Sequence, residues 1–360
     1  MPLADGTHDP HDSPHDPPAR YADDPAVVAQ LEQMAVASGA APNSLQARLV
    51  RDIMQTALKL VPDGRDMGEL KLMTNSLKEM RYAYRIFAKY RDPHKITIFG
   101  SARTAEDHPD YTACVQFSKL MAEAGWMAIT GAGLGIMKAG HVGPGRGASF
   151  GVAIRLPFET SANSIIEGDE KLIHFRYFFT RKLMFISQAE AVALFPGGFG
   201  TMDEAFEALT LVQTGRSSPM PIVCVEGAGR DYWPQWDKWV RSQLLDRGWV
   251  SPEDPDIYYI AKDPADAARH VLRFYRNYHS SRYVRDDLVI RLHRPLRKDD
   301  IARLEHDFKA LIKTGGMRMG GPLPEESDHP DLPRLVFTHT KHKYGTVHAL
   351  IDRINELEPA

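Results

Sequence analysis

The sequence predicts an α/β protein whose core is a Rossmann-like, doubly wound parallel sheet, with N-terminal helices and a small C-terminal α+β extension. Two observations support this prediction. Short apolar runs at 95–99, 126–130 and 191–195 each end in a glycine-rich turn. Helical periodicity fills the segments between them. Such alternation of short strands with helices is typical of a parallel sheet that helices cover on both faces.

The first part of the chain divides into a polar tail and a helical segment. Residues 1–24 are rich in Pro, Asp and His, and nothing apolar would fix them, so we expect a disordered tail rather than a metal site. Residues 25–92 place apolar side chains at helical spacing in three stretches, 27–36, 45–60 and 67–90. These helices carry no recognisable chemistry, and we expect them to pack onto a core or a partner subunit.

The segment 93–280 is predicted to be a single Rossmann-like nucleotide-binding domain. Besides the three strands already named, its pattern predicts further elements in chain order. These are a helix over 110–124, a strand over 149–156, a helix over 176–188, a strand over 221–225, and helices over 232–245 and 265–278.

The segment 281–360 reads as a separate α+β extension. Strands are predicted at 288–292 and 334–338, and helices at 299–312 and 344–357. The glycine-rich stretch 315–322 is expected to be a flexible connection. This extension is too small to suggest a second site of its own.

Composition excludes several classes of protein. The 360 residues are 43% hydrophobic and 25% charged with a net charge of −3, so no basic field points to nucleic acid. No apolar run approaches a membrane span, and the N-terminus lacks the features of a signal peptide. Cys114 and Cys224, the two cysteines, sit in apolar patterns and are expected in the core. We therefore expect a cytoplasmic protein with neither nucleic-acid nor membrane partners.

Residues 196–204, Pro-Gly-Gly-Phe-Gly-Thr-Met-Asp-Glu, hold the strongest functional signal. They join a buried strand to a helix, and glycines there let the backbone approach a ligand while unpaired N–H groups face an anion. Asp203 and Glu204 then place carboxylates beside this anion site. A phosphate alone would repel them, so we infer that another part of the same ligand interacts with an acid.

Three glycine-rich turns stand at the carboxyl ends of predicted strands, after Phe99, Thr130 and Phe195. Parallel sheets bind ligands at that edge, so the turns should converge on one crevice. The turn 131–135, Gly-Ala-Gly-Leu-Gly, resembles a dinucleotide fingerprint, but its third glycine comes one residue early. A nicotinamide cofactor is therefore not predicted, and the chain has no P-loop motif.

Charged residues near these turns are the candidate chemical groups. Arg181 and Lys182 lie on a helix otherwise rich in apolar and aromatic residues, and cations in a buried setting need an anionic partner. Glu204 and Glu207 share one helix face, although acids in a first turn also suit the helix dipole. Residues on the other loops could add a hydroxyl, cations and an acid at the crevice rim: Ser101, Arg103, Arg155, Glu159 and Asn163.

The histidines of the folded part show no metal-ligand spacing, and no metal site is predicted. His342 and His348 are expected to be polar surface residues near the end of the chain.

The motif at 196–204 fits the pattern P-G-G-x-G-T-x-x-E, and Arg181-Lys182 precedes it as an R-K pair. Together with the strand that runs into Gly100-Ser101, these residues resemble the LOG ("lonely guy") family. Its members are cytokinin-activating nucleoside 5′-monophosphate phosphoribohydrolases, often mislabelled as lysine decarboxylases. The similarity covers about residues 95–260, and Leu-Pro-Phe-Glu at 156–159 looks like the longer bacterial branch.

The resemblance implies hydrolysis of the N-glycosidic bond of a nucleoside 5′-monophosphate, which releases a free base and ribose 5-phosphate. Residues 93–280 would then be the catalytic domain. Arg181 and Glu204 match the catalytic pair, while phosphate and substrate binding would fall to Ser101, Gly133, Glu159, Lys182, Gly197, Gly198, Gly200, Thr201 and Glu207. No metal or organic cofactor is implied, and a homodimer or larger homo-oligomer is expected.

The resemblance leaves the base open between isopentenyladenine, adenine or another. The plant-type M-H-x-R-K-A-E-M is here Phe-Phe-Thr-Arg-Lys-Leu-Met-Phe, which removes a histidine and a glutamate. A second hypothesis is a non-catalytic nucleotide sensor or carrier that kept the anion site. A third, lysine decarboxylase, would need pyridoxal phosphate and a Schiff-base lysine, and no lysine context suggests one.

Overall fold

The computed structural model describes residues 21–155 and 162–357 and divides the chain into two compact units, of which one ends at Arg81 and the other begins at Tyr82. The first unit holds α1 (Pro25–Ala37), α2 (Leu45–Lys59) and most of α3 (Met67–Phe87). Asp24 caps α1 by accepting from the N–H of Ala26 at 2.7 Å, and Ser44 caps α2 in the same way. α1 and α2 share a small core around Ala35 and Ala47.

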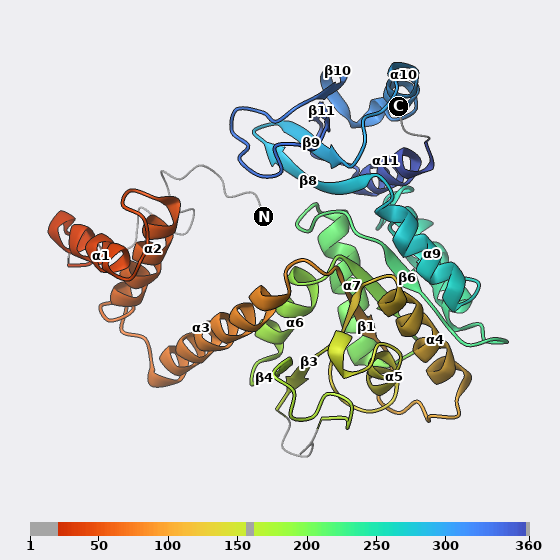
Figure 1. The fold of residues 1–360 in the computed structure, drawn as a ribbon, viewed down its shortest axis with the longest axis horizontal. Helices are drawn as coiled ribbons and strands as arrows, with labels where there is room; N and C mark the ends of the chain where they lie inside the picture. Colours follow the sequence, from red (N-terminus) through yellow and green to blue (C-terminus); the bar gives the residue numbers. More distant parts are fainter. Residues whose placement is uncertain (1–20, 156–161, 358–360) are drawn as a thin grey trace. The chain divides into compact units, whose positions relative to one another are not determined.

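The second unit contains a seven-stranded parallel sheet, which confirms the predicted fold class (Figure 1). Its strand order is β4-β3-β2-β1-β5-β6-β7, so the order reverses between β1 and β5. The strands are β1 (Lys95–Phe99), β2 (Met127–Thr130), β3 (Ser149–Ile154), β4 (Leu172–Phe175), β5 (Ala191–Leu194), β6 (Ile222–Cys224) and β7 (Tyr258–Ile260). The short β4 and β7 are absent from the sequence prediction.

Six helices connect these strands or follow them. They are α4 (Pro109–Glu123), α5 (Ile136–Val142), α6 (Phe178–Ser187), α7 (Phe199–Gln213), α8 (Tyr232–Val240) and α9 (Pro264–Phe274). α4 packs against α5 and α9. Right-handed crossovers place α4 and α5 on one face of the sheet, and α6, α7 and α8 on the other. α9 follows β7 and lies on the same face as α4, against which it packs. Cys114 and Cys224 are free and fully buried, as predicted.

The C-terminal part forms a four-stranded antiparallel sheet in the order β10-β11-β9-β8 (Figure 1). Its elements are β8 (Tyr278–Val284), β9 (Asp287–Leu292), α10 (Lys298–Asp307), β10 (Ile312–Gly320), β11 (Arg334–His339) and α11 (Tyr344–Glu356). The prediction of a flexible connection at 315–322 is wrong, because most of it is the edge strand β10. Backbone pairing needs no side chains, and Gly315 at φ +71° lies where the register shifts.

Two further predictions for the C-terminal part fail. His348 is 2% exposed rather than on the surface, because it lies on the buried face of α11 with Val347 and Ile351. The helix expected over 265–278 ends at Phe274, and Tyr278 begins β8. His342 is exposed, as predicted. No helix within the described ranges is both long and apolar enough to cross a membrane.

A buried ion cluster fixes the loop between β10 and β11. The Glu326 side chain is fully buried, and its two carboxylate oxygens receive Arg291 at 2.6 Å and Arg334 at 3.2 Å. Burial alone would raise the pKa of Glu326, but hydrogen bonds from Leu323 N and from both arginines outweigh it and lower that pKa. Arg334 is itself fully buried. The loop is therefore held to the sheet by charges that have no access to water.

Candidate functional site

The three glycine-rich turns meet at the carboxyl edge of the parallel sheet, as predicted. The backbone of Ser101, after β1, joins the other two turns. Its N–H donates to the carbonyl of Pro196 at 3.1 Å, and its carbonyl accepts from the N–H of Ile136 at 3.0 Å. Because β1 and β5 flank the reversal in strand order, this junction lies at the switch point where α/β sheets bind ligands.

Close backbone contacts explain why glycine stands at two positions of this junction. A Cβ at Gly135, where φ is +59°, would collide with the carbonyl oxygen of Ser101. A Cβ at Gly197 would collide with the Thr201 hydroxyl and lie 3.0 Å from the N–H of Ser101. The turns pack against one another too tightly for any side chain.

The first turn of α7 is the predicted phosphate-binding segment. Gly198, Phe199 and Gly200 are exposed, whereas Thr201 is 6% exposed. A Cβ at Gly198 or Gly200 would meet no atom within 4 Å, so there is open space above the turn. The helix N-terminus thus presents its first N–H groups to solvent, an arrangement that suits an anion.

Glu204 lies one turn into α7 and is only 8% exposed. Burial raises its pKa to about 7, although the nearby charges of Lys182 and Arg181 act to lower it. The Lys182 amine is 3.9 Å from Glu204 Oε2, which has no hydrogen-bond partner in the described structure. A carboxyl group with a pKa near 7 suits acid–base chemistry near neutral pH, and Glu204 has this property beside the candidate anion site.

Lys182 joins α6 to α7 through carboxylates. Its amine lies 2.9 Å from Asp203 and 2.9 Å from Glu207. Burial acts to lower the pKa of Lys182, but the hydrogen bonds to Asp203 and Glu207 outweigh it and raise that pKa. Lys182 and Glu207, both predicted to bind substrate, are paired with each other here, so their positive and negative charges offset one another next to Glu204.

Arg181 reaches the second glycine-rich turn. Its Nε donates to the carbonyl of Val152 at 2.9 Å, and its guanidinium lies 5.0 Å from the centre of the Phe185 ring. A Cβ at Gly131 would come within 2.5 Å of Arg181 Nη2. Arg181 and Glu204 thus approach the same junction from neighbouring helices, α6 and α7.

The setting of the Arg181-Lys182 pair differs from the expectation of a wholly buried helix. Three large apolar side chains of α6 are exposed, namely Phe178 (59%), Phe179 (52%) and Leu183 (43%). Because α6 covers the sheet with one face, its other face turns outward with these residues on it. The need of Lys182 for anionic partners is nevertheless met, by α7.

The turn that contains Gly133 is held by a buried polar network that the sequence did not reveal. Asn163, expected at the crevice rim, is 3% exposed, and its amide donates to the carbonyls of Ala132 and Gly133, each at 3.0 Å. Its side chain also contacts His141 Nδ1, while His141 Nε2 lies 2.9 Å from the Thr130 hydroxyl. Nothing in residue spacing indicates this network, because its members come from three separate elements.

Replacing Asn163 with Ala should destabilise the protein by about 1–3 kcal/mol, because the carbonyls of Ala132 and Gly133 and the buried His141 Nδ1 lose the Asn163 side chain as a partner. Ser164→Ala, at the exposed neighbouring position, is the matched control and should change stability by less than about 0.5 kcal/mol. Urea unfolding of both variants measures the difference. Equal midpoints would show that the network does not hold the turn.

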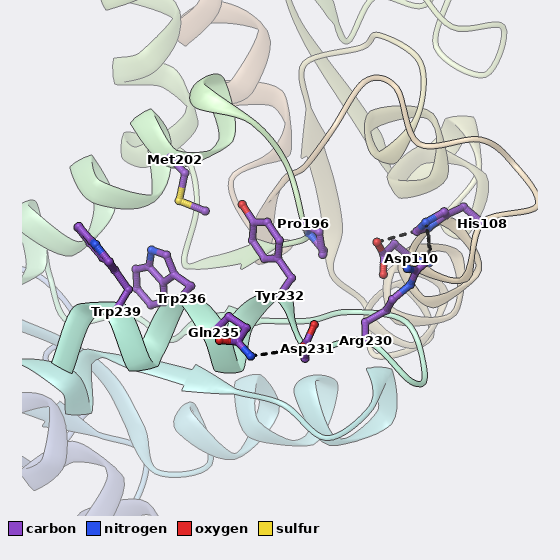
Figure 2. A pocket seen from close by; sticks show the side chains of 10 residues that line it. All are labelled: His108, Asp110, Pro196, Met202, Arg230, Asp231, Tyr232, Gln235, Trp236 and Trp239. Carbon is purple, nitrogen blue, oxygen red and sulfur yellow. Dashed lines mark hydrogen bonds and ion pairs between the residues drawn. The ribbon is translucent and has the colours of Figure 1, made fainter. Parts of the chain in front are cut away.

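A hollow of about 670 Å³ borders the glycine-rich turn at the start of α7 (Figure 2). Pro196 and Met202 belong to the α7 side, and Tyr232, Trp236 and Trp239 come from α8. Met202 and Glu204 lie two residues apart on α7 and thus point to roughly opposite sides of the helix. The hollow and the Glu204 site are therefore two compartments that share the turn.

The remaining predicted site residues are placed as follows. Ser101 is half-buried, and its hydroxyl accepts from the N–H of Arg103, which is exposed. Arg155 is exposed as well. Glu159 lies outside the described residues. Within residues 21–155 and 162–357, no three His, Cys, Asp or Glu side chains gather as a metal site would require.

A parallel sheet with glycine-rich turns and a helix N-terminus at its switch point defines a Rossmann-like α/β protein with a candidate anion site. Within it, residues 132–271 match the family model described as "Possible lysine decarboxylase", the domain of LOG-family proteins. No curated protein matches the chain significantly.

Solved structures with similar folds are related only distantly. The X-ray structure of TM1055, a structural genomics target, is 19% identical, with a TM-score of 0.36 over 50% of this chain and 99% of that one. The molybdenum cofactor carrier protein from Chlamydomonas reinhardtii is 21% identical, with a TM-score of 0.35 over 50% and 97%. The molybdenum cofactor binding protein from Rippkaea orientalis is 16% identical, with a TM-score of 0.35 over 51% and 96%.

Proposed function

We propose that this protein hydrolyses the N-glycosidic bond of a nucleoside 5′-monophosphate and releases a free base and ribose 5-phosphate. The observation that supports this most is the position of Glu204, a buried carboxyl group with a pKa raised by burial to about 7, one turn beyond an exposed helix N-terminus. An anion site and a proton-exchanging carboxyl group side by side suit a ligand that has a phosphate and a reacting sugar.

In this proposal the first turn of α7 binds the 5′-phosphate. Gly197, Gly198, Gly200 and Thr201 supply the backbone there, and the space above Gly198 and Gly200 receives the anion. Ser101 and Gly133 belong to the adjoining turns. Binding energy from the phosphate, remote from the breaking bond, holds the ribose in position over Glu204.

Cleavage of the N-glycosidic bond develops positive charge on the ribose, which resembles an oxocarbenium ion. The ionised Glu204 carboxylate stabilises that charge and orients or deprotonates the attacking water. Arg181 keeps a guanidinium at the junction, where it favours the ionised form of Glu204 and holds the ligand in register. Lys182 favours the ionised form as well, whereas Glu207 opposes it.

The test is direct. Purified protein is incubated with AMP, isopentenyladenosine monophosphate, GMP and UMP, and chromatography measures free base and ribose 5-phosphate. Equimolar release of both products from at least one nucleotide supports hydrolysis, and the preferred nucleotide identifies the base. Binding without release from all four would instead support the carrier or sensor.

Base release should depend on pH through Glu204. The carboxylate is the active form, and its pKa is raised to about 7, so kcat/KM should rise with pH and level off above a midpoint near 7. If Glu204 acted as the acid, the rate would fall through the same range instead. A profile of kcat/KM from pH 5 to 9 separates the two roles.

We also propose that the protein assembles as a homodimer or larger homo-oligomer. Exposed aromatic side chains on α6 and α7 support this, since Phe178, Phe179, Phe199 and Phe206 are between 37% and 97% exposed. Apolar surface of this kind is typical of interfaces. Light scattering on the wild type and on Phe179→Ser would measure the assembly, and a monomer at all concentrations would contradict it.

A further inference from the structure

The hollow between α7 and α8 has no part in the reaction proposed for Glu204, and it has the features of a ligand site in its own right. Its volume of about 670 Å³ is in the usual range for small-molecule pockets. One end is aromatic and the other is charged (Figure 2). These two ends suggest which kind of ligand it would bind.

The aromatic end offers ring surfaces for stacking. Trp236 and Trp239 line it from α8, and Phe206 of α7 supports both, with ring centres 6.1 Å and 6.5 Å away. Trp239 is 47% exposed, an unusual position for so large an aromatic side chain. Exposed aromatic faces in a concave setting favour a flat ring as ligand.

Trp236 adds a hydrogen-bond donor to this end. Its indole N–H is buried and has no partner in the described structure, which is unfavourable for a hydrogen-bond donor. In Figure 2 the indole nitrogen is on the edge of the ring that faces Met202. Met202 is a flexible thioether, so in the proposed complex it would move to let an acceptor in the hollow reach the N–H. A ring with a nitrogen or carbonyl acceptor would satisfy it.

The charged end holds one cation, Arg230, and two carboxylates, Asp110 and Asp231. The carboxylates already have partners, since Asp110 accepts from the N–H of Gly227 at 2.7 Å and Asp231 accepts from the Gln235 amide at 3.2 Å. Arg230 is exposed and donates from Nη2 to His108 Nε2 at 2.7 Å, and His108 Nδ1 lies 3.4 Å from the carboxylate of Asp110. Because a guanidinium has five N–H donors, this contact leaves donors for an anionic group. His108 and Asp110 thus hold Arg230 at the edge of the hollow (Figure 2).

We propose that this hollow is a second ligand site, separate from Glu204, for a heteroaromatic anion such as a nucleotide. The ring stacks on Trp236 and Trp239 and accepts from the Trp236 N–H, while Arg230 binds the anionic group. This site does not depend on the hydrolytic function proposed for Glu204. It touches the phosphate-binding turn, because the Tyr232 hydroxyl donates to the carbonyl of Gly197 at 2.6 Å.

The experiment uses the full chain carrying Glu204→Gln and 5-fluorotryptophan, so that five ¹⁹F signals report on the five tryptophans. AMP, GMP and UMP are titrated separately. Adenosine lacks the anion and ribose 5-phosphate lacks the ring, so both serve as ligand controls. Single Trp→Phe variants assign the signals. Arg230→Ala and Trp239→Ala test the two ends, and Lys238→Ala, at the exposed position before Trp239, is the matched control.

The expected result is a saturable shift of the Trp236 and Trp239 signals with at least one nucleotide, while Trp126 and Trp249 stay unchanged. Binding should weaken at least about tenfold in Arg230→Ala and Trp239→Ala, and for both ligand controls, but not in Lys238→Ala. The proposal is overturned if no nucleotide shifts the two signals. It is also overturned if Arg230→Ala leaves the shift unchanged, or if the signals follow protein concentration alone, as a second copy covering the hollow would cause. Base release by the wild type is measured separately, so either proposal can fail alone.

Discussion

Glu204→Gln is expected to lower the rate of base release by about 10³-fold and to leave nucleotide binding within a few-fold of wild type. The amide has nearly the same shape as the carboxyl group but cannot ionise, so the developing charge on the ribose loses its counter-charge. In the proposed complex the phosphate contacts come from the backbone of the α7 turn, which the substitution leaves in place. Single-turnover release of base and equilibrium binding of AMP measure the two effects separately.

Asp203→Asn is the matched control for this prediction. Its side chain is 62% exposed and shares Lys182 with Glu207, so the variant should retain activity within about tenfold. Unchanged turnover in Glu204→Gln would remove Glu204 from the mechanism. An equal loss of activity in both variants would mean that the summed charge of the carboxylates around Lys182 matters, not Glu204 in particular.

The change in stability caused by Glu204→Gln provides a second control. The variant is expected to gain stability, whereas a damaged fold would lose it. The pKa of Glu204 is about 7 in the folded state against an ordinary 4.5, so the folded protein binds the proton more tightly. That contribution to stability is complete below pH 4.5 and is lost as pH rises through 7. At pH 8 the variant should therefore be more stable than wild type, by up to about 3 kcal/mol, with no difference below pH 4.5.

The second large effect is expected in the C-terminal part, where Glu326→Ala should destabilise the protein by about 3–5 kcal/mol. The substitution leaves Arg291 and Arg334 buried, 5% and 0% exposed, without the carboxylate that lies between them. Removing one partner of a buried pair costs far more than the pair itself contributes. Urea unfolding at pH 7 measures the loss.

Glu325→Ala is the control at the adjacent position, because Glu325 pairs with Arg285 on the surface, where their side chains are 43% and 84% exposed. Surface pairs contribute about 0–1 kcal/mol, so this variant should unfold almost as wild type does. The folded-state pKa of Glu326 is lowered, so its contribution is fully present above the unfolded pKa and is lost as pH falls through the lower, folded-state pKa. The loss in Glu326→Ala should therefore shrink as pH is lowered. A loss that stays constant down to the pH at which the wild type unfolds would mean that packing, not charge, is lost.

Much of the fold could be predicted because its strong elements leave local signals. β1, β2, β3, β5 and β6 are short apolar runs next to turns or helices, and alternation with helices implies parallel pairing. β7 is three residues long and only half-buried, so it has no such pattern. β10 has three glycines among nine residues and is recognisable only through its partner β11. Both β7 and β10 form strands because they pair with segments that are distant in the sequence.

In the candidate site, too, local patterns could be predicted and long-range contacts could not. Glu204 and the glycines of the α7 turn are contiguous, and their order in the chain already predicts an anion site. The contact of Asn163 with Gly133, and that of Tyr232 with Gly197, join residues far apart in sequence. The hollow beyond Tyr232 escaped prediction for the same reason, since its two ends come from three different connections between strands and helices.

The position of β1 beside β5 has a consequence for the order in which the protein folds. Phe99 pairs with Leu194, so the turns after β1 and β5 meet only when two distant segments have found each other. Contacts of such long range form late, because the intervening chain must be ordered first. A nascent chain that has emerged only as far as β4 has the first two turns but no place for a phosphate. Capture of a phosphate ligand at α7 would therefore mark the pairing of β5 with β1.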